Sequence, residues 1–393
     1  MKHPHHKRLL VGSYVGMVSL STQINTLAVC LVPIARTFDG LTQAQMGLIS
    51  TLSFVGVVVG ILGAGPLADR YGMRPFIILG AALELVGQAL MGLAPNYGLL
   101  LMLSVVGGLG VGMLDALLSP LVCHLCDEAR ASALNLLHAF YCIGAVATVA
   151  GASYLLKHEQ SWRVIFPVMT APSILCGLVF VATPFPHWRG PREAENGLRG
   201  MLRRPLFLVL VLTMFLAGAN ELAAAQWIPA YMAKVFGWSE ASAGMTLMGF
   251  SVSMAVGRLL ASGMTRRVSP MRLLLAATSL GLCSLAAAVL SNSGASAAVG
   301  FCALGLAVGP LWPTVLAYTA EHVPHGGATL FSILAGVGNG GGVIGPVAVG
   351  LVADRLGLRG GMGIVALAAI ALLAIFLGRA RAERYARPGL PKT

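Results

Sequence analysis

Charged residues are scarce in this sequence. Only 10% of its 393 residues are Asp, Glu, Lys or Arg, whereas 57% are hydrophobic. Soluble domains carry about 25% charged residues, because charge keeps their surface hydrated. So few charges exclude a water-soluble globule. Acids are the rarer charge, with 14 Asp and Glu against 26 Lys and Arg, so each acid inside an apolar run calls for an explanation.

Several functional signals are also missing. The seven cysteines fall inside or at the ends of apolar runs, which indicates packing residues and no disulfide framework. Cys123 and Cys126 have the spacing of a metal-ligand pair, but no second pair accompanies them, so we expect no metal site. No small-residue cleavage site follows the basic N-terminus, which argues against a signal peptide. A Gly-x-x-x-x-Gly-Lys-Ser/Thr loop is absent, so we expect no ATP chemistry and no cofactor.

Long apolar segments separated by short polar breaks fill the chain. A helix of about 20 apolar residues crosses a membrane, and a backbone in lipid must satisfy its own hydrogen bonds. The segments are continuously apolar and do not alternate, which excludes a β-barrel. We therefore predict an all-α membrane protein with twelve transmembrane helices, near 9–36, 44–67, 74–94, 97–122, 130–156, 161–182, 205–234, 241–263, 271–291, 295–319, 328–351 and 360–379.

Two halves are expected. A polar linker at 184–204 separates a six-helix bundle at 1–183 from a second bundle and short tail at 205–393. Similar segments recur at an offset near half the chain length, 65–83 with 263–280 and 151–166 with 347–362. Such internal repetition indicates two pseudo-repeated bundles. In transporters built from two such halves, the substrate site lies at the interface between them.

The basic residues predict the orientation. With a cytoplasmic N-terminus, 19 of the 26 Lys and Arg lie on the inner side and 6 in outer loops, as the positive-inside rule requires. We therefore expect both termini in the cytoplasm. The net charge of +12 then reflects topology and contact with anionic lipids, not nucleic-acid binding.

One motif carries a family resemblance. The run GPLADRYGMRP resembles the signature of the major facilitator superfamily between the second and third helices, on which Gly65, Asp69, Arg70, Gly72 and Arg74 fall. The second-half copy has lost the acidic residue. The resemblance implies the twelve-helix, two-bundle fold of an alternating-access transporter. We expect Asp69, Arg70 and Arg74 to latch the halves at the cytoplasmic side.

A subgroup is suggested by three further segments. The glycine-rich fourth helix lacks the arginine of many members and ends in an acid, and with the segments at 133–145 and 217–232 it is similar to the fucose/glucose porter group. That group includes fucose permeases and sodium-dependent glucose transporters. Ser119 stands where members often have Asn. The resemblance implies a small polar substrate, a sugar or polyol, taken up with a proton or sodium ion.

Asp115 is the first candidate for ion coupling. A charge inside a membrane helix costs about 2.5–3.5 kcal/mol and faces protein or a water-filled cavity. Gly108, Gly112, Asp115 and Ser119 share one face of the fourth helix, so another helix or a ligand can approach closely. Asp115 either exchanges a proton or binds sodium, or it is a structural acid bonded to backbone or Ser119. Glu221, near the middle of the seventh helix, is the second candidate.

Substrate contacts are expected from amides and aromatic rings. Asn220, Trp227 and Tyr231 share a stripe that suits a sugar, with interfacial-belt aromatics as the alternative. Glu221 and Gln226 would reach one cavity only if the helix unwinds locally. His138 is either a proton relay or a neutral hydrogen-bonding residue. The predicted substrate-binding residues are Gln23, Asn25, Asn135, His138, Tyr141, Asn220, Gln226, Trp227, Tyr231, Trp312 and Asn339.

Two further features are interpreted separately. Trp312 lies between Pro310 and Pro313, where we expect a kink that serves as a gate. Glu84 in the third helix either pairs, faces a crevice or takes part in transport.

The sequence therefore predicts a secondary active transporter of a sugar or polyol, working by alternating access as a proton or sodium symporter. An exporter of drugs or amphipathic metabolites is the alternative within transporters. A non-transporting membrane receptor or enzyme is the alternative from another class, but no nucleophile constellation or soluble catalytic domain supports it, and we expect no enzymatic activity. We expect a monomer in contact with lipids of a bacterial inner membrane. The direction of transport and the coupling ion stay open.

Overall fold

The computed structural model describes residues 5–38, 40–186, 197–323 and 326–385. Every regular element in this part of the chain is a helix. Twelve helical segments are long and apolar enough to span a membrane, and each overlaps one predicted span. The prediction of an all-α protein with twelve transmembrane helices is confirmed.

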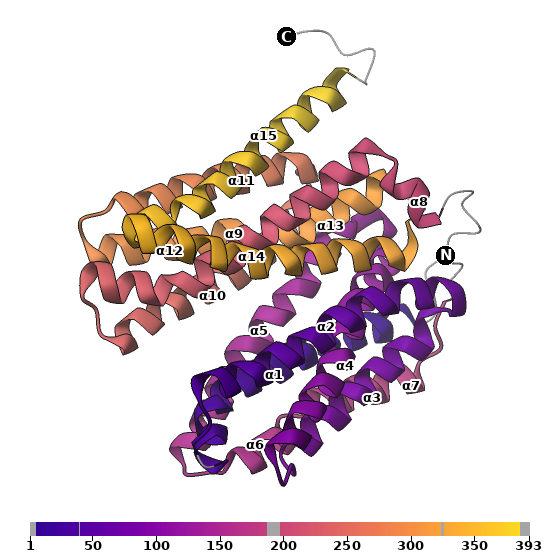
Figure 1. Ribbon diagram of the computed structural model, residues 1–393. Coiled ribbons are helices and arrows are strands. Elements are labelled where there is room, and N and C mark those ends of the chain that lie inside the picture. Colours follow the sequence, from indigo (N-terminus) through magenta and orange to yellow (C-terminus); the bar gives the residue numbers. More distant parts are fainter. Residues whose placement is uncertain (1–4, 39, 187–196, 324–325, 386–393) are drawn as a thin grey trace. The chain divides into compact units, whose positions relative to one another are not determined.

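The helices follow one another along the chain as Figure 1 shows. The first half holds α1 His6–Thr37, α2 Gln43–Tyr71, α3 Met73–Met91, α4 Tyr97–Leu125, the 3-10 turn η1 Asp127–Ala129, α5 Arg130–Lys157, α6 Trp162–Val168, α7 Ala171–Ala182 and α8 Gly197–Leu202. The second half holds α9 Pro205–Phe236, α10 Glu240–Met264, α11 Pro270–Leu290, α12 Gly294–Val308, α13 Leu311–His322, α14 Gly327–Gly361 and α15 Gly363–Tyr385.

Local side-chain chemistry explains where several helices begin and end. Thr42 accepts a bond from the Gln45 N–H and donates its own N–H to the Gln45 side chain, a capping box at the start of α2. Asn96 and Ser239 cap α4 and α10 by accepting first-turn N–H groups. Gly237 ends α9 at a φ of 69°, a conformation that glycine adopts without a Cβ penalty.

Two membrane spans consist of two separate helices each, and α14 has a break near its end at Gly357, where φ is 70°. The sixth consists of α6 and α7, and the tenth consists of α12 and α13, with a break at Gly309–Pro310. Proline has no N–H and cannot continue the helical bonding pattern. The kink expected from Pro310 and Pro313 is therefore present.

The seventh span is not interrupted. Helix α9 is continuous from Pro205 to Phe236, through Gly218 and Pro229. The local unwinding that would bring Glu221 and Gln226 to one cavity does not occur. Because successive residues of a regular helix turn by about 100°, these two side chains point to different sides of α9.

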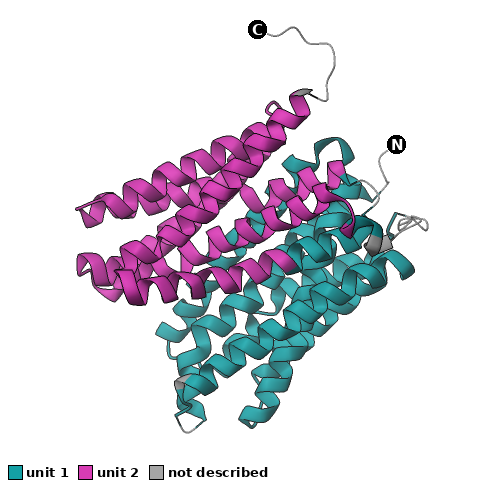
Figure 2. Ribbon diagram, turned by 45° about the horizontal axis from the view of Figure 1, so that its top comes forward, with its two compact units in different colours: residues 1–201, 323–336 teal, residues 202–322, 337–393 magenta. Residues whose placement is uncertain are grey.

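The chain forms two compact units, coloured separately in Figure 2. Unit 1 comprises Met1–Met201 with Val323–Gly336, and unit 2 comprises Leu202–His322 with Val337–Thr393. The segment Val323–Gly336 belongs to the second half of the sequence but groups with unit 1. Residues 187–196 of the expected linker lie outside the described residues.

Glycines allow the helices of unit 1 to pack backbone against backbone. A Cβ added at Gly108 or Gly112 of α4 would lie 2.1 Å from a carbonyl oxygen of α2, that of Ser53 or Val57. A Cβ at Gly60 of α2 would lie 2.4 Å from the Leu109 carbonyl oxygen of α4. The stripe predicted on α4 therefore receives a neighbouring helix, as small residues do in membranes.

This contact predicts opposite outcomes for two neighbouring alanine substitutions in α2. Gly60→Ala forces the α2 and α4 backbones apart and should destabilise the protein by about 1–3 kcal/mol, as overpacking does. Gly63→Ala is the matched control, because nothing lies within 4 Å of a Cβ there; it should be neutral or stabilising. Thermal melting of the purified variants measures both. Equal melting temperatures would contradict the packing argument.

Candidate functional site

The predicted site residues are divided between the two units. Gln23, Asn25, Asn135, His138, Tyr141 and Asp115 lie in unit 1, whereas Asn220, Glu221, Gln226, Trp227, Tyr231, Trp312 and Asn339 lie in unit 2.

In unit 1, helices α4 and α5 bring two predicted residues together. The Ser119 hydroxyl lies 3.3 Å from His138 Nε2, and both side chains are buried. Asn135, one turn before His138, donates its amide to the Ala131 carbonyl of its own helix at 2.9 Å. His138 of α5 therefore meets the serine end of the α4 stripe.

Asp115 lies four residues before Ser119 and is half-buried. Its carboxylate forms no hydrogen bond or ion pair with any residue that the structure describes. The structural alternative, an acid bonded to backbone or to Ser119, is thus not what unit 1 contains. A carboxylate in a membrane span without a protein counter-charge is a candidate functional group, so Asp115 stays a candidate for ion coupling.

The two predicted residues of α1, Gln23 and Asn25, make contacts within unit 1. Gln23 is buried, and its amide nitrogen packs on Gly107 of α4, where an added Cβ would lie only 2.2 Å away. Asn25 is half-buried and donates to the Ser21 carbonyl of its own helix at 2.8 Å. The Ser21 hydroxyl in turn donates to the backbone carbonyl of Tyr141, whose side chain is half-buried.

In unit 2, Glu221 forms an ion pair with Arg258 of α10. Arg258 Nη2 lies 3.0 Å from Glu221 Oε1 and 3.2 Å from Oε2, and the two side chains are only 4% and 13% exposed. Arg258 Nε donates to the Gly309 carbonyl at 2.9 Å. Arg258 therefore joins α9, α10 and the break between α12 and α13.

The proline after the break explains why this carbonyl is available. In an α-helix the carbonyl of residue i accepts the N–H of residue i+4, and the residue four after Gly309 is Pro313. Because proline has no N–H, the Gly309 oxygen has no partner within its own helix. Arg258 supplies that partner, so the broken span and the ion pair are one arrangement.

Sequence reasoning missed Arg258. The signal was present, because Arg258 is a basic residue well inside a predicted span, and an intramembrane charge indicates a partner or a site. Helical spacing within α9 or α10 could not show that Glu221 and Arg258 face each other.

The three residues of the expected α9 stripe are packed inside unit 2. Asn220 donates to the Val365 carbonyl at 3.0 Å, Trp227 to that of Pro346 at 2.9 Å and Tyr231 to that of Val289 at 3.2 Å. Asn220 and Tyr231 are buried, Trp227 is half-buried, and Gln226 is exposed. Of the predicted residues on α9, Glu221, Gln226 and Trp227 therefore retain exposed surface, whereas Asn220 and Tyr231 do not.

The glycine-rich part of α14 packs closely on its neighbours in unit 2. A Cβ at Gly338 would lie 2.6 Å from the Trp312 ring, and one at Gly341 would lie 2.0 Å from the Phe215 carbonyl oxygen of α9. Trp312 thus packs on the α14 backbone. Asn339 is half-buried within the same glycine run.

The signature between α2 and α3 holds the start of α14 within unit 1. Asp69 accepts the backbone N–H groups of Ala328 and Thr329 at 2.8 and 2.9 Å and the Thr329 hydroxyl at 2.6 Å. A carboxylate is favourable at this position, because the first N–H groups of a helix have no helical partner. A Cβ at Gly65 would lie 2.2 Å from the Ser332 hydroxyl, so glycine permits this contact.

The two arginines of the signature make local contacts. Arg74 Nη2 donates to the Val181 carbonyl at 3.0 Å, and the Arg70 guanidinium lies 5.1 Å from the centre of the Tyr71 ring. Of the three predicted latch residues, Asp69 therefore makes the contact with the second half of the sequence.

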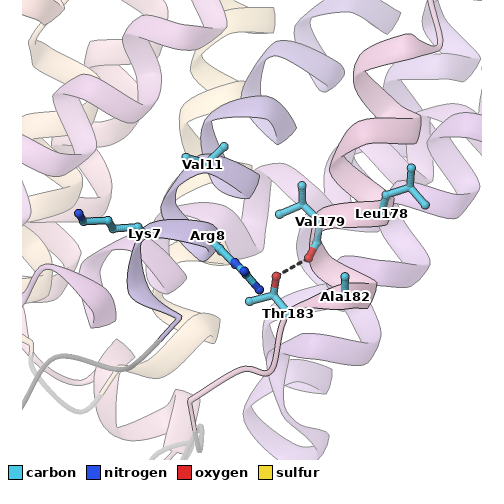
Figure 3. A pocket seen from close by; sticks show the side chains of 7 residues that line it. All are labelled: Lys7, Arg8, Val11, Leu178, Val179, Ala182 and Thr183. Carbon is cyan, nitrogen blue, oxygen red and sulfur yellow. Dashed lines mark hydrogen bonds between the residues drawn. The ribbon is translucent and has the colours of Figure 1, made fainter.

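A surface pocket of about 460 Å³ lies elsewhere in unit 1 (Figure 3). It is bounded by the start of α1 and the end of α7. Its lining consists of Lys7, Arg8, Val11, Leu178, Val179, Ala182 and Thr183. None of the predicted site residues belongs to it.

Twelve apolar spans and acids inside them define a multi-pass membrane protein. The sequence matches the profile of the Major Facilitator Superfamily over residues 13–329. The chain belongs to this superfamily and is a transporter by family and fold, as the signature at 65–75 predicts.

Individual relatives are distant. A probable 4-methylmuconolactone transporter of Cupriavidus pinatubonensis is 25% identical over 94% of this chain and 89% of its own. The fold is similar to that of the fucose:proton symporter FucP of Escherichia coli, with a TM-score of 0.82, 20% identity and coverage of 93% and 97%. The proton:xylose symporter XylE has a TM-score of 0.76, 14% identity and coverage of 97% and 96%. At these identities the likeness shows a shared fold, and the membership shown is that of the superfamily.

The Glu221–Arg258 pair predicts strong non-additivity between two substitutions. Arg258→Met should destabilise the protein by about 3–5 kcal/mol, because it leaves the buried Glu221 charge uncompensated. The double variant Glu221→Gln with Arg258→Met should recover much of that loss. Melting temperatures of the single and double variants form the cycle. Losses that simply add would show that the two charges do not interact.

Proposed function

We propose that this transporter moves a small polar solute, a sugar or polyol, by alternating access, coupled to the entry of a proton. The observation that carries the proposal is Asp115, a half-buried carboxylate in a membrane span without a bonding partner among the described residues. Such a group changes its charge when it binds a proton, and so links the ion to the state of the protein. Sodium binding to the same carboxylate is the alternative form of coupling.

Several observations support the substrate class. Amide, hydroxyl and imidazole groups lie on the α4 and α5 faces near Asp115, including Ser119 and His138, and Trp227 and Trp312 keep exposed surface in unit 2. Hydroxyl-rich solutes bind through such polar groups beside aromatic rings. Two solved proteins of similar fold are a fucose:proton symporter and a proton:xylose symporter.

Glu221 has a different part in the proposal. Because Arg258 neutralises it, Glu221 orients Arg258 and presents polar atoms in unit 2, whereas Asp115 binds the ion. Gln23, Asn25, Asn135, Tyr141, Asn220, Gln226, Tyr231 and Asn339 remain proposed substrate-side residues. We place the protein in an inner membrane with both termini in the cytoplasm, on the basic-residue distribution.

The test is Asp115→Asn in reconstituted vesicles. Asparagine keeps the shape of aspartate but binds no proton, so accumulation driven by a proton gradient should fall to the level reached without a gradient. Counterflow exchange, which needs no net ion movement, should persist. Asp127→Asn is the matched control, because Asp127 is an exposed acid just beyond α4, and it should accumulate solute normally.

The substrate is identified first by thermal-shift screening of sugars, polyols and organic acids, with and without sodium and at two pH values. The organic acids are included because a relative is a probable 4-methylmuconolactone transporter. Normal accumulation by Asp115→Asn would overturn the coupling role. Outward movement of amphipathic compounds by the wild type would favour an exporter.

A further inference from the structure

A second acid lies in the interior of unit 1, and the proposed transport mechanism does not use it. The Glu84 side chain of α3 has no exposed surface. Its Oε1 accepts the Ser19 hydroxyl of α1 at 2.6 Å and the Ser173 hydroxyl of α7 at 3.2 Å, and the two hydroxyls lie 2.8 Å from each other. Three helices therefore meet at one carboxyl oxygen.

Four polar atoms around this point have no hydrogen-bond partner among the described residues. They are Glu84 Oε2, both side-chain polar atoms of Gln88, and Gln23 Oε1, and all are buried. Buried polar groups are nearly always hydrogen-bonded, so four unpartnered atoms in one region indicate that something is missing from the bonding pattern.

The four atoms belong to neighbouring side chains. Gln88 lies one helical turn after Glu84 on the same face of α3, and Gln23 lies one turn after Ser19 on α1. Gly107 of α4 joins the two, because a Cβ there would lie 2.2 Å from the Gln23 amide nitrogen, and a Cβ at Gly87 would lie 2.4 Å from the Gly107 nitrogen. Gln23 therefore packs on the same residue of α4 that α3 contacts at Gly87, the residue before Gln88.

Donors and acceptors decide what is missing. With an ionised Glu84, the four atoms are three acceptors, Glu84 Oε2, Gln88 Oε1 and Gln23 Oε1, and one donor, Gln88 Nε2. That donor can serve two of the acceptors, and Gln88 Oε1 stays unpaired beside an uncompensated charge. One proton on Glu84 Oε2 removes the charge and adds a second donor. Two hydrogen bonds then satisfy all four atoms.

We propose that Glu84 binds a proton that completes a hydrogen-bonded chain across α7, α3 and α1. In this chain Ser19 and Ser173 donate to Glu84 Oε1, the proton on Glu84 Oε2 is donated to Gln88 Oε1, and Gln88 Nε2 donates to Gln23 Oε1. The last two bonds form when the two amide side chains rotate toward their partners. The site takes a proton and no larger ligand.

The surroundings supply no competing charge. Among the described residues no Lys, Arg or His forms an ion pair with Glu84, and Cys176 of α7 is the titratable group that faces it. Glu84 has no solvent-exposed surface, whereas Asp115 is half-buried. The Glu84 proton is therefore retained during transport and joins the helices of unit 1, and the proposal does not depend on Asp115 being the coupling acid.

Infrared spectroscopy of the purified full-length protein in lipid nanodiscs tests the proposal. At neutral pH the wild type should show the C=O stretching band of a protonated carboxyl, and Glu84→Gln should remove that band. Asp115→Asn is the matched control, because it replaces the other interior acid of unit 1, and it should keep the Glu84 band. The measurement needs no substrate and no transport, so it stands even if the proposed function fails.

A second measurement follows melting temperature against pH. The wild type should lose stability as the pH rises and Glu84 gives up its proton. Glu84→Gln, which is neutral at every pH, should lack that pH-dependent loss.

Two outcomes would overturn the proposal. The first is an infrared carboxyl band that is unchanged in Glu84→Gln. The second is a sodium-dependent rise in melting temperature that is present in the wild type and absent in Glu84→Gln, because the occupant would then be a metal cation.

Gln88→Met keeps the test decisive if Glu84→Gln does not fold. Methionine has a similar shape but cannot accept the Glu84 proton. The carboxyl band should remain and shift in frequency, because its hydrogen bond is lost. An unshifted band would show that Gln88 is not the acceptor and would overturn the chain.

Discussion

The constraint on which this structure depends is the absence of water inside a membrane. A polar group there must find its partner within the protein, and an unpartnered charge is costly. Three acids lie well inside the spans, and they meet this constraint in three ways. Glu221 pairs with an arginine, Glu84 accepts two hydroxyls, and Asp115 bonds to none of the described residues. What each acid can do follows from that difference.

The ion pair of unit 2 is tied to the backbone through two prolines. Pro310 lies at the break between α12 and α13, and Pro313 leaves the Gly309 carbonyl without a helical partner. Arg258 bonds that carbonyl and Glu221 with the same guanidinium group. The bonds of Arg258 to Glu221 and to the Gly309 carbonyl are therefore coupled, so a change in the charge of Glu221 affects the bonding at the break between α12 and α13. An apolar residue at position 258 would leave both a carboxylate and a carbonyl unsatisfied.

The sequence predicts those features that depend on residues close to one another along the chain. Twelve spans follow from length and hydropathy, the break in the tenth span follows from Pro310 and Pro313, and the close approach at Gly108 and Gly112 follows from helical spacing. The role of Asp69 as the cap of α14 does not follow, because its partners lie about 260 residues further along the chain.

The same reasoning explains what the sequence could not show at the candidate site. Asn220, Trp227 and Tyr231 share a stripe on α9, but each polar group bonds a carbonyl of a different helix or helix end. Periodicity shows which residues share a face and cannot show what that face meets. Arg258 was visible as a charge in a span, yet its partner was not, because the rotation of α10 against α9 is set by packing.

Exposure separates the two acids of unit 1. An acid that couples an ion to transport must exchange that ion with solvent, and a half-buried carboxylate such as Asp115 can do so as its surroundings change. Glu84 has no exposed atom and lies among three helices that its hydroxyl partners hold together. Exchange of a proton between Glu84 and solvent would require those three helices to separate. The proton proposed at Glu84 would therefore stabilise the packing of unit 1, whereas the coupling role proposed for Asp115 requires a proton that is gained and lost in each transport cycle.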